Sequence, residues 1–308
     1  MQKGDCMNTL LVRIVLAAAL VCGISVSALA GVVLENEHGK VYEETVTLGG
    51  VSVDADWYIP SQPAIGFTYM VHGFGFGILG REMMREVSLE YMKQGIVVLA
   101  PTIDASGGNE TLAYAVANQL IDNPPVSPEG PIPNAVVISG HSAGGLHASL
   151  VVKQMLLRGS NKIRGAVLFD PVDSGNKFEG AVDVIVNHPE LPVLSIVANG
   201  GVCNLWNNTE DDIERMPRAY VGIKLLDRSS HMDVVGNDST GVLGAIFCGG
   251  PIPSSENVAR NYAFSSHWAY DMLTGAYTSD YYPFGGVLST LLNDGKASLL
   301  KDYVIPGC

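Results

Sequence analysis

Charged residues are scarce in this sequence, and basic residues are the scarcest. Charged residues make up 16% of the 308, and 18 Lys and Arg stand against 31 Asp and Glu, giving a formal net charge of -13. This acidic surplus disfavours nucleic acids and anionic membranes as partners, because both are negatively charged. The 47% of hydrophobic residues supports a sizeable core and argues against disorder. We therefore expect a folded protein that acts on a neutral or apolar substrate.

Cysteine is also rare, and neither a Cys-x-x-Cys motif nor a His pair at ligand spacing occurs. We therefore expect no metal and no cofactor. Cys203, Cys248 and Cys308 lie beyond the N-terminal region, and three cysteines allow one disulfide and one odd thiol. A bridge between Cys203 and Cys248 would steady the segment between them, which carries His231. Cys308 is the alternative partner for either residue.

The N-terminal residues have the features of a secretory signal peptide. Lys3 and Arg13 supply positive charge, residues 14–22 are uninterruptedly apolar, and Ala28-Leu29-Ala30 is a small-residue cleavage motif. We predict that residues 1–30 are removed and that residues 31–308 form one domain of a secreted, periplasmic or ER-lumenal protein. The uncharged run is short for a bilayer span and no later segment reaches that length, so no stable span is expected in the mature chain.

Short apolar runs alternate with segments of helical periodicity through the rest of the sequence. Strands are expected at residues 46–48, 51–59, 65–71, 96–100, 135–139, 164–169, 193–197 and 221–226, and helices at 82–94, 111–121, 146–157 and 256–273. Gly49-Gly50 between the first two strands signals a hairpin. The last expected strand is 221–226, and 256–273 is the expected closing helix. This alternation predicts a mostly parallel sheet with helices on both faces.

The strongest functional signal is Gly140-His141-Ser142-Ala143-Gly144, which matches the G-x-S-x-G nucleophile elbow. In such an elbow the serine sits on a tight strand-to-helix turn with strained backbone angles. Glycines two residues to either side prevent clashes in that turn. Here an apolar strand precedes the motif and a helix follows it, as the elbow requires. The motif therefore predicts an α/β-hydrolase fold with Ser142 as the nucleophile.

A glycine-rich segment, His72-Gly73-Phe74-Gly75, follows the expected strand at residues 65–71. In α/β-hydrolases one backbone N–H of the oxyanion hole comes from this loop, and the other comes from the residue after the nucleophile. The N–H groups of Phe74 and Ala143 are therefore the candidates. Nearby apolar side chains are candidates for lining a substrate groove, with core packing as the alternative: Phe76, Ile78 and Leu79.

The general base should be a histidine after the last strand, because the chain order of these triads is Ser, Asp, His. Among the seven His residues, His231 follows the strand expected at 221–226 and lies in a polar loop. Its main competitor, His267, falls within the long helix expected at 256–273. A loop lets an imidazole reach the serine and exchange its proton near neutral pH. His231 is therefore the predicted base.

Several carboxylates compete for the role of the supporting acid. Asp170 ends the strand after the elbow helix, so it should lie at the same sheet edge as Ser142, where ligands bind in open α/β sheets. Asp173 lies three residues further on. Glu210, Asp211 and Asp212 belong to a polar stretch at residues 202–218, which is expected to form a loop or small cap over the site. Asp170 is the preferred acid, with Asp173 as the nearest alternative.

Three short motifs in this order resemble the chlorophyllase family. They are the elbow with its second glycine, Gly140 to Gly145, then Asp170-Pro171-Val172, and finally His231-Met232-Asp233. The family's catalytic serine, aspartate and histidine fall on Ser142, Asp170 and His231, and the resemblance covers roughly residues 65–235. It implies the α/β-hydrolase fold and cleavage of chlorophyll to chlorophyllide and phytol. Plant members usually carry Arg after the serine, where this chain has Ala143.

Together these features predict a serine carboxylic-ester hydrolase that acts on small apolar esters through an acyl-enzyme. A chlorophyllase-type substrate is one possibility. Secreted cutinases, lipases and polyester-cleaving hydrolases share the elbow and suit an export signal better. Two rivals differ in class: a peptidase or amidase of the same fold, and a non-catalytic binding protein built on it.

Overall fold

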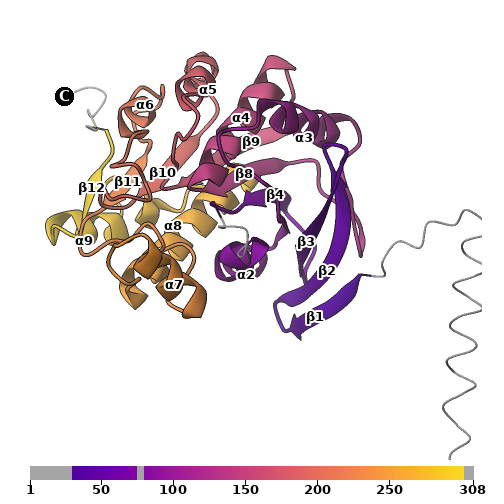
Figure 1. The fold of residues 1–308 in the computed structure, drawn as a ribbon, viewed down its shortest axis with the longest axis horizontal. Coiled ribbons are helices and arrows are strands. Elements are labelled where there is room, and N and C mark those ends of the chain that lie inside the picture. Colours follow the sequence, from indigo (N-terminus) through magenta and orange to yellow (C-terminus); the bar gives the residue numbers. More distant parts are fainter. Residues whose placement is uncertain (1–29, 75–79, 302–308) are drawn as a thin grey trace, which may run out of the picture.

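The computed structural model describes residues 30–74 and 80–301 (Figure 1). The predicted signal peptide, except Ala30, lies outside the described residues. The same holds for the three candidate groove residues, Phe76, Ile78 and Leu79, and for Cys308. The assignments made for these residues therefore stay predictions.

A ten-stranded sheet runs through the molecule in the order β1-β2-β3-β5-β4-β8-β9-β10-β11-β12. The six central strands, β5-β4-β8-β9-β10-β11, pair in parallel with their neighbours in this group. At one side of the sheet β1, β2 and β3 pair antiparallel, and at the other side β12 does so. Their bounds are β1 Gly31–Asn36, β2 Gly39–Leu48, β3 Val51–Pro60, β4 Gly66–Val71, β5 Ile96–Pro101, β8 Val136–His141, β9 Ile163–Phe169, β10 Val193–Val197, β11 Gly222–Leu225 and β12 Ala297–Leu299. A short separate hairpin joins β6 Val126–Ser127 to β7 Gly130–Pro131.

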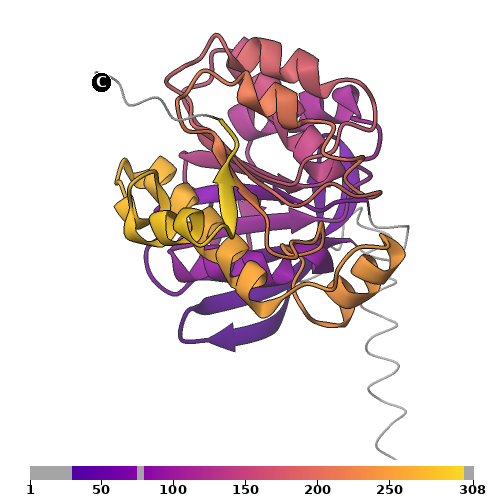
Figure 2. The ribbon, with the colours of Figure 1, turned by 90° about the vertical axis from the view of Figure 1, so that its left-hand side faces the viewer.

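Helices cover both faces of this sheet (Figures 1 and 2). One layer contains α3 Glu110–Asp122, α4 Ala143–Leu157, α5 Phe178–Ile185 and α6 Glu210–Glu214. The other contains α2 Arg85–Lys93, entered through the 3₁₀ turn η1 Arg81–Met84, with α8 Ser255–Thr274 and α9 Gly286–Asn293, which follows η2 Ser279–Tyr281. The remaining helix, α7 Ser239–Phe247, lies between β11 and α8 along the chain. Within the described ranges no helix combines the length and the apolar character that a bilayer span needs.

The two helix layers enclose two hydrophobic cores, one on each face of the sheet. Side chains alternate between them along each strand: Val136 and Ile138 of β8 enter the core under α3 and α4, whereas Val137 enters the core under α2 and α8. Every residue of β4, β5 and β8 is therefore buried. This explains why these strands read as continuous apolar runs in the sequence.

The predicted mostly parallel sheet between helices is confirmed, and so is the Gly49-Gly50 hairpin between β2 and β3. Two predictions about the end of the chain are wrong. The strand at 221–226 is not the last one, since β12 pairs with β11 at the sheet edge, and α8 does not close the fold, since α9 follows it. Helices α5, α7 and α9 were not predicted. Each is eight or nine residues long, which gives the helical period little room to show.

Candidate active site

Ser142 occupies a strained turn between β8 and α4. Its φ of 56° lies in the left-handed region that residues with a side chain rarely adopt. The turn is held at both ends, because the Ser142 N–H donates to the carbonyl of Phe169 at 3.0 Å and the Ser142 carbonyl accepts from the N–H of Val172 at 3.1 Å. Ser142 is thus fixed at the carboxyl edge of the sheet, beside the end of β9.

The glycines of the elbow are required by close backbone contacts. A Cβ atom on Gly140 would lie 2.2 Å from the carbonyl oxygen of Gly144, and one on Gly144 would lie 2.3 Å from the carbonyl oxygen of His72. Both separations are far below van der Waals contact. The first contact sets the tightness of the turn, and the second lets the loop after β4 lie directly against the start of α4.

The loop after β4 also touches the serine. A Cβ atom on Gly73 would lie 2.9 Å from the Cβ of Ser142. His72 holds this loop: its Nδ1–H donates to the Gly73 carbonyl at 2.5 Å, and its Nε2 accepts from the N–H of Ile103 at 3.1 Å. Burial lowers the pKa of His72, which favours this neutral form. The backbone leading to Phe74 and the first residue of α4, Ala143, therefore flank Ser142.

His231 and Asp170 meet in a partly buried hydrogen bond. The Nδ1–H of His231 donates to Oδ2 of Asp170 at 2.6 Å, and both side chains are less than a tenth exposed. Asp170 itself has a φ of 43° and follows β9 directly, as its N–H donates to the carbonyl of Ile196 at 2.7 Å. The structure thus brings together the predicted base and the preferred acid, which are 61 residues apart in the sequence.

Two further donors hold the Asp170 carboxylate. The N–H of Ala198 donates to Oδ1 at 3.2 Å, and Nδ2 of the buried Asn204 donates to Oδ2 at 3.0 Å. The Asn204 amide also donates to the carbonyl of Asn199, and its Oδ1 accepts from the N–H of Gly201 at 2.6 Å. Both carboxylate oxygens are therefore satisfied, and Asn204 ties the acid to the turn that follows β10.

His141 links the Ser142 turn to His231, the predicted base. Its Nε2–H donates to the backbone carbonyl of His231 at 2.8 Å, and the two imidazole rings lie 4.6 Å apart between centroids. Burial, followed by the neighbouring His231, lowers the pKa of His141 well below its usual range, so its ring stays neutral. Because His141 immediately precedes Ser142, this bond places the loop that carries His231 next to the Ser142 turn.

Asp233 is a second buried carboxylate beside His231. Its Oδ2 accepts from the N–H of Ser230 at 2.7 Å, which fixes the turn that carries His231. Its Oδ1 is buried with no hydrogen-bond partner among the described residues. Burial, with a smaller contribution from the charge of Asp170, raises the pKa of Asp233 to about 7. Sequence reasoning gave Asp233 no role beyond its place in the His-Met-Asp motif.

The competing acids and the competing base have other partners. Asp173 accepts from the N–H groups of Gly175, Lys177 and Phe178 and so organises the start of α5. Glu210 pairs with Lys224 at 2.7 Å. His267 lies within α8, where its ring donates to the carbonyl of Ala263 and stacks on Tyr281. None of these side chains contacts the His231–Asp170 pair in the described part of the chain.

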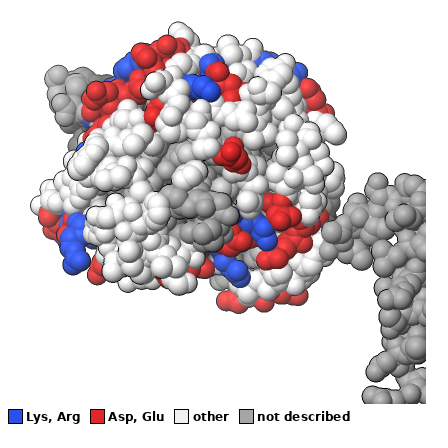
Figure 3. All heavy atoms as spheres, viewed as in Figure 1, with Lys and Arg blue, Asp and Glu red and all other residues white. Residues whose placement is uncertain are grey.

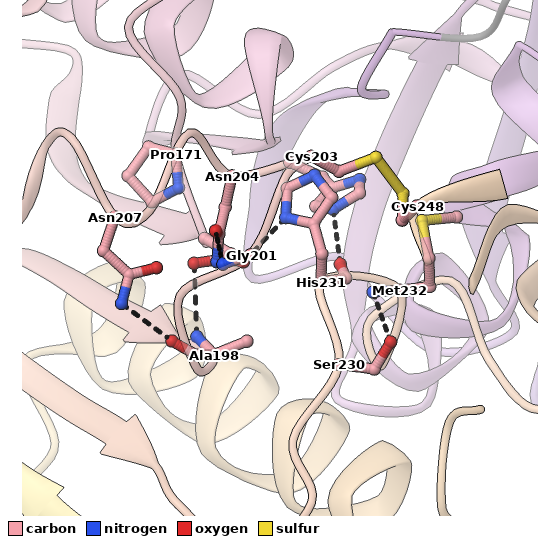
Figure 4. A network of polar contacts seen from close by, with 12 residues as sticks. Pro171, Ala198, Gly201, Cys203, Asn204, Asn207, Ser230, His231, Met232 and Cys248 are labelled. Carbon is pink, nitrogen blue, oxygen red and sulfur yellow. Dashed lines mark hydrogen bonds and ion pairs between the residues drawn. A yellow bond between two sulfur atoms is a disulfide. The ribbon is translucent and has the colours of Figure 1, made fainter. Parts of the chain in front are cut away.

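A disulfide joins Cys203 to Cys248, which is one of the pairings that the sequence left open. Figure 4 shows it beside Asn204 and His231. It links the turn after β10 to the end of α7, and the two segments enclose a cavity of about 260 Å³ whose lining includes His231. The stretch expected to form a cap, residues 202–218, is this turn followed by α6, and within it Leu205, Trp206 and Asn207 have consecutive positive φ values.

Asn204 is the site residue that sequence reasoning missed. It lies in an Asn-rich turn that carried no recognised motif, and its contact with Asp170 spans 34 residues.

A larger groove of about 510 Å³ lies at the opposite edge of the sheet, lined in part by Arg164, Tyr220 and Tyr282. It contains none of the predicted site residues.

Among the described residues, no group of three or more His, Cys, Asp or Glu side chains is arranged to hold a metal ion.

No protein-family model matches the sequence, and no curated protein sequence matches it either. Solved structures do match the fold. A dienelactone hydrolase from Anabaena variabilis aligns over 75% of this chain and 97% of its own, with a TM-score of 0.52 and 17% sequence identity. An esterase from Pyrobaculum calidifontis aligns over 87% and 93%, with a TM-score of 0.53 and 14% identity. A cold-adapted esterase from an Arctic intertidal metagenomic library aligns over 76% and 96%, with a TM-score of 0.51 and 15% identity.

The fold is that of the α/β-hydrolases. The predicted fold class is thereby confirmed from two sides: by the order and direction of the strands, and by the likeness to these enzymes. At this level of sequence identity the likeness concerns the fold alone. The chemistry depends on the residues at the carboxyl edge of the sheet.

Proposed function

We propose that this protein is a serine carboxylic-ester hydrolase with Ser142 as nucleophile, His231 as base and Asp170 as supporting acid. The observation that carries the proposal is the 2.6 Å hydrogen bond between His231 and Asp170, on loops adjoining the strained Ser142 elbow. A carboxylate on Nδ1 leaves Nε2 of the same ring free of a proton and able to accept one from a serine hydroxyl. The fold shared with two enzymes named as esterases and one named as a dienelactone hydrolase supports the same reaction class.

In this mechanism Ser142 Oγ attacks the ester carbonyl carbon while its proton passes to Nε2 of His231. The imidazolium then donates that proton to the leaving alkoxide, and an acyl-enzyme remains. A water molecule, deprotonated by His231, attacks the acyl carbonyl and releases the carboxylic acid and free Ser142. Asp170 accepts the Nδ1–H of His231 and stabilises the imidazolium, while Ala198 and Asn204 also donate to its carboxylate.

The oxyanion that forms at each step needs fixed donors, and we assign them to the N–H groups of Phe74 and Ala143. Two contacts support this assignment. Gly73 packs against Ser142, and Gly144 packs against the backbone of His72, so both peptide segments adjoin the nucleophile. Ala143 also begins α4, whose helix dipole favours negative charge at that end. Removing one such donor typically costs about 10²–10³ in rate.

For the substrate we propose a small apolar ester, with chlorophyll as the specific candidate that the Asp-Pro-Val and His-Met-Asp motifs suggest. Phe76, Ile78 and Leu79 are the residues that we propose to line the groove for this substrate.

We also propose export with removal of residues 1–30. The disulfide supports export, because such bonds persist mainly in oxidising compartments.

The test is turnover of chlorophyll beside short and long p-nitrophenyl esters by the wild type and by Ser142→Ala. We expect ester cleavage by the wild type and a loss of at least about 10⁴-fold in kcat in the variant. Release of chlorophyllide by the wild type alone would extend the proposal to chlorophyll. Turnover of simple esters alone would give a general secreted esterase.

Two outcomes would overturn the proposal. Faster cleavage of amides than of esters with matched acyl groups would indicate a peptidase or amidase. Inertness toward every ester and toward a serine-reactive phosphonate would indicate a non-catalytic binding protein. Labelling of the wild type by that phosphonate, with no labelling of Ser142→Ala, is the outcome that the proposed nucleophile requires.

A further inference from the structure

Helix α7 has an unusual distribution of apolar side chains. Its buried residues are small, namely Gly241, Gly244 and Ala245, and a Cβ atom on Gly244 would lie 2.2 Å from Cε of Met232. Its large apolar residues Leu243, Ile246 and Phe247 face outward and are each more than 60% exposed. A helix that only covered a core would show the reverse arrangement, as α5 does with Phe178 and Ile185 buried.

The turn after β10 extends this apolar surface. Val202, Leu205 and Trp206 are exposed there, and Trp206 is 74% exposed. Ile252, just beyond α7, is exposed as well. The Cys203–Cys248 disulfide joins the turn to the end of α7. We call this surface the α7 face: Val202, Leu205, Trp206, Leu243, Ile246, Phe247 and Ile252.

The α7 face carries no formal charge. Neither residues 199–208 nor residues 239–255 contain an Asp, Glu, Lys or Arg, although the whole chain has a net charge of -13. Figure 3 shows the surface over α7 in white, with charged side chains around it. So many exposed apolar side chains on two linked segments are rare on a protein that has no partner for them, because each exposed side chain costs solvation free energy. An acidic protein that keeps one face neutral is suited to contact with an uncharged phase.

The α7 face borders the proposed catalytic base. Val202, Trp206 and both disulfide cysteines line the cavity of about 260 Å³ that His231 also lines. Anything apolar that covers the face therefore lies next to the residue that must take the serine proton. The disulfide holds the two halves of the face in a fixed relation to each other and to Asn204, the residue that donates to Asp170.

We propose that the α7 face docks the enzyme on the surface of an aggregated, uncharged ester, such as a droplet of neutral acylglycerol. The proposal rests on the proposed ester hydrolase function and extends it to a substrate class. A neutral droplet matches the uncharged face, and its surface presents the ester bonds themselves. An anionic bilayer would be repelled by the acidic remainder of the protein.

The test measures flotation of the Ser142→Ala protein without residues 1–30, mixed with trioctanoin droplets, so that binding is read without hydrolysis. The pair Ile246→Asp and Phe247→Asp places two charges on the face. The matched control, Leu157→Asp with Val126→Asp, changes two equally exposed apolar residues elsewhere. We expect the face pair to reduce the droplet-bound fraction at least about tenfold and the control pair to bind like the parent. Circular dichroism and thermal melting verify that both pairs are folded.

Several results would overturn the proposal that the α7 face docks on ester droplets. They are failure of the parent protein to float, equal flotation of the two pairs, and stronger binding to phosphatidylglycerol vesicles than to droplets. A stable dimer that the face pair dissociates, without droplet binding, would make the face an interface between two copies of the chain. Failure of the ester hydrolase function is read separately, as absence of p-nitrophenyl acetate cleavage by the wild type. Flotation of the Ser142→Ala protein does not depend on that activity.

Discussion

Two buried aspartates lie near His231, and they differ in the number of hydrogen bonds that they accept. Asp170 receives hydrogen bonds on both oxygens, from Ala198, Asn204 and the imidazole. Asp233 receives one on Oδ2, and its other oxygen has no partner within the described residues. Burial without sufficient compensation raises the pKa of Asp233 to about 7. The two carboxylates thus differ in how many hydrogen-bond donors the neighbouring segments supply to each of them.

The largest expected difference between the two aspartates is in catalysis. Asp170→Asn should lower kcat by about 10³–10⁴-fold, because the amide favours the wrong imidazole tautomer and cannot stabilise the imidazolium. Asp233→Asn should lower kcat by less than about tenfold, since Asp233 accepts from the backbone of the turn, whereas Asp170 is the aspartate bonded to the His231 ring. Steady-state kinetics on a soluble p-nitrophenyl ester measures both. Equal losses in the two variants would contradict the assigned roles.

The disulfide anchors the turn that carries Asn204, and Asn204 donates a hydrogen bond to Asp170. Replacing both cysteines, Cys203→Ser with Cys248→Ser, should reduce the free energy of unfolding by about 2–4 kcal/mol, because the bridge closes a 45-residue separation. Urea unfolding of the variant and the wild type measures the change. Reductant should shift the wild-type midpoint toward that of the variant and leave the variant unchanged. An unshifted wild type would contradict this role.

Asn204 tests whether the donors around Asp170 matter for the reaction. Asn204→Leu removes the donor to Oδ2, and kcat should fall about 10- to 100-fold with little change in KM, since a hydrogen bond to a charged group is worth roughly 1.5–3 kcal/mol. The matched control is Asn208→Leu, because Asn208 bonds the backbone of Asp173 outside the site. A similar loss in both variants would indicate a general disturbance of the turn.

Asp233 should also make the stability of the folded protein depend on pH. Its folded-state pKa of about 7 lies above the ordinary 3.8, so the folded protein keeps a proton that the unfolded chain has already lost. The stability from this group is fully present below pH 4 and is lost as the pH rises to about 7. The melting temperature of Asp233→Asn should therefore rise relative to that of the wild type between about pH 4.5 and 7.5. A constant difference across this range would contradict the raised pKa.

Much of this architecture could be predicted because its signals are local. Strands buried on both faces appear as short apolar runs, and the Gly49-Gly50 pair marks the hairpin between β2 and β3. The elbow also has a local signature, since its glycines are needed within the turn itself. Short elements such as α7 and β12 lack such signals. The inverted arrangement of small and large residues on α7 further obscures the usual helical pattern.

By itself, then, the sequence determined the parallel sheet, the position of the Ser142 turn and a short set of acids and bases. These depend on residue periodicity and turn geometry over a few neighbouring positions. Only the tertiary structure decided which carboxylate contacts His231, which cysteines pair, and that Asn204 completes the environment of Asp170. These choices depend on contacts between segments 34 to 61 residues apart, which the packing of strands and helices fixes and no local pattern encodes.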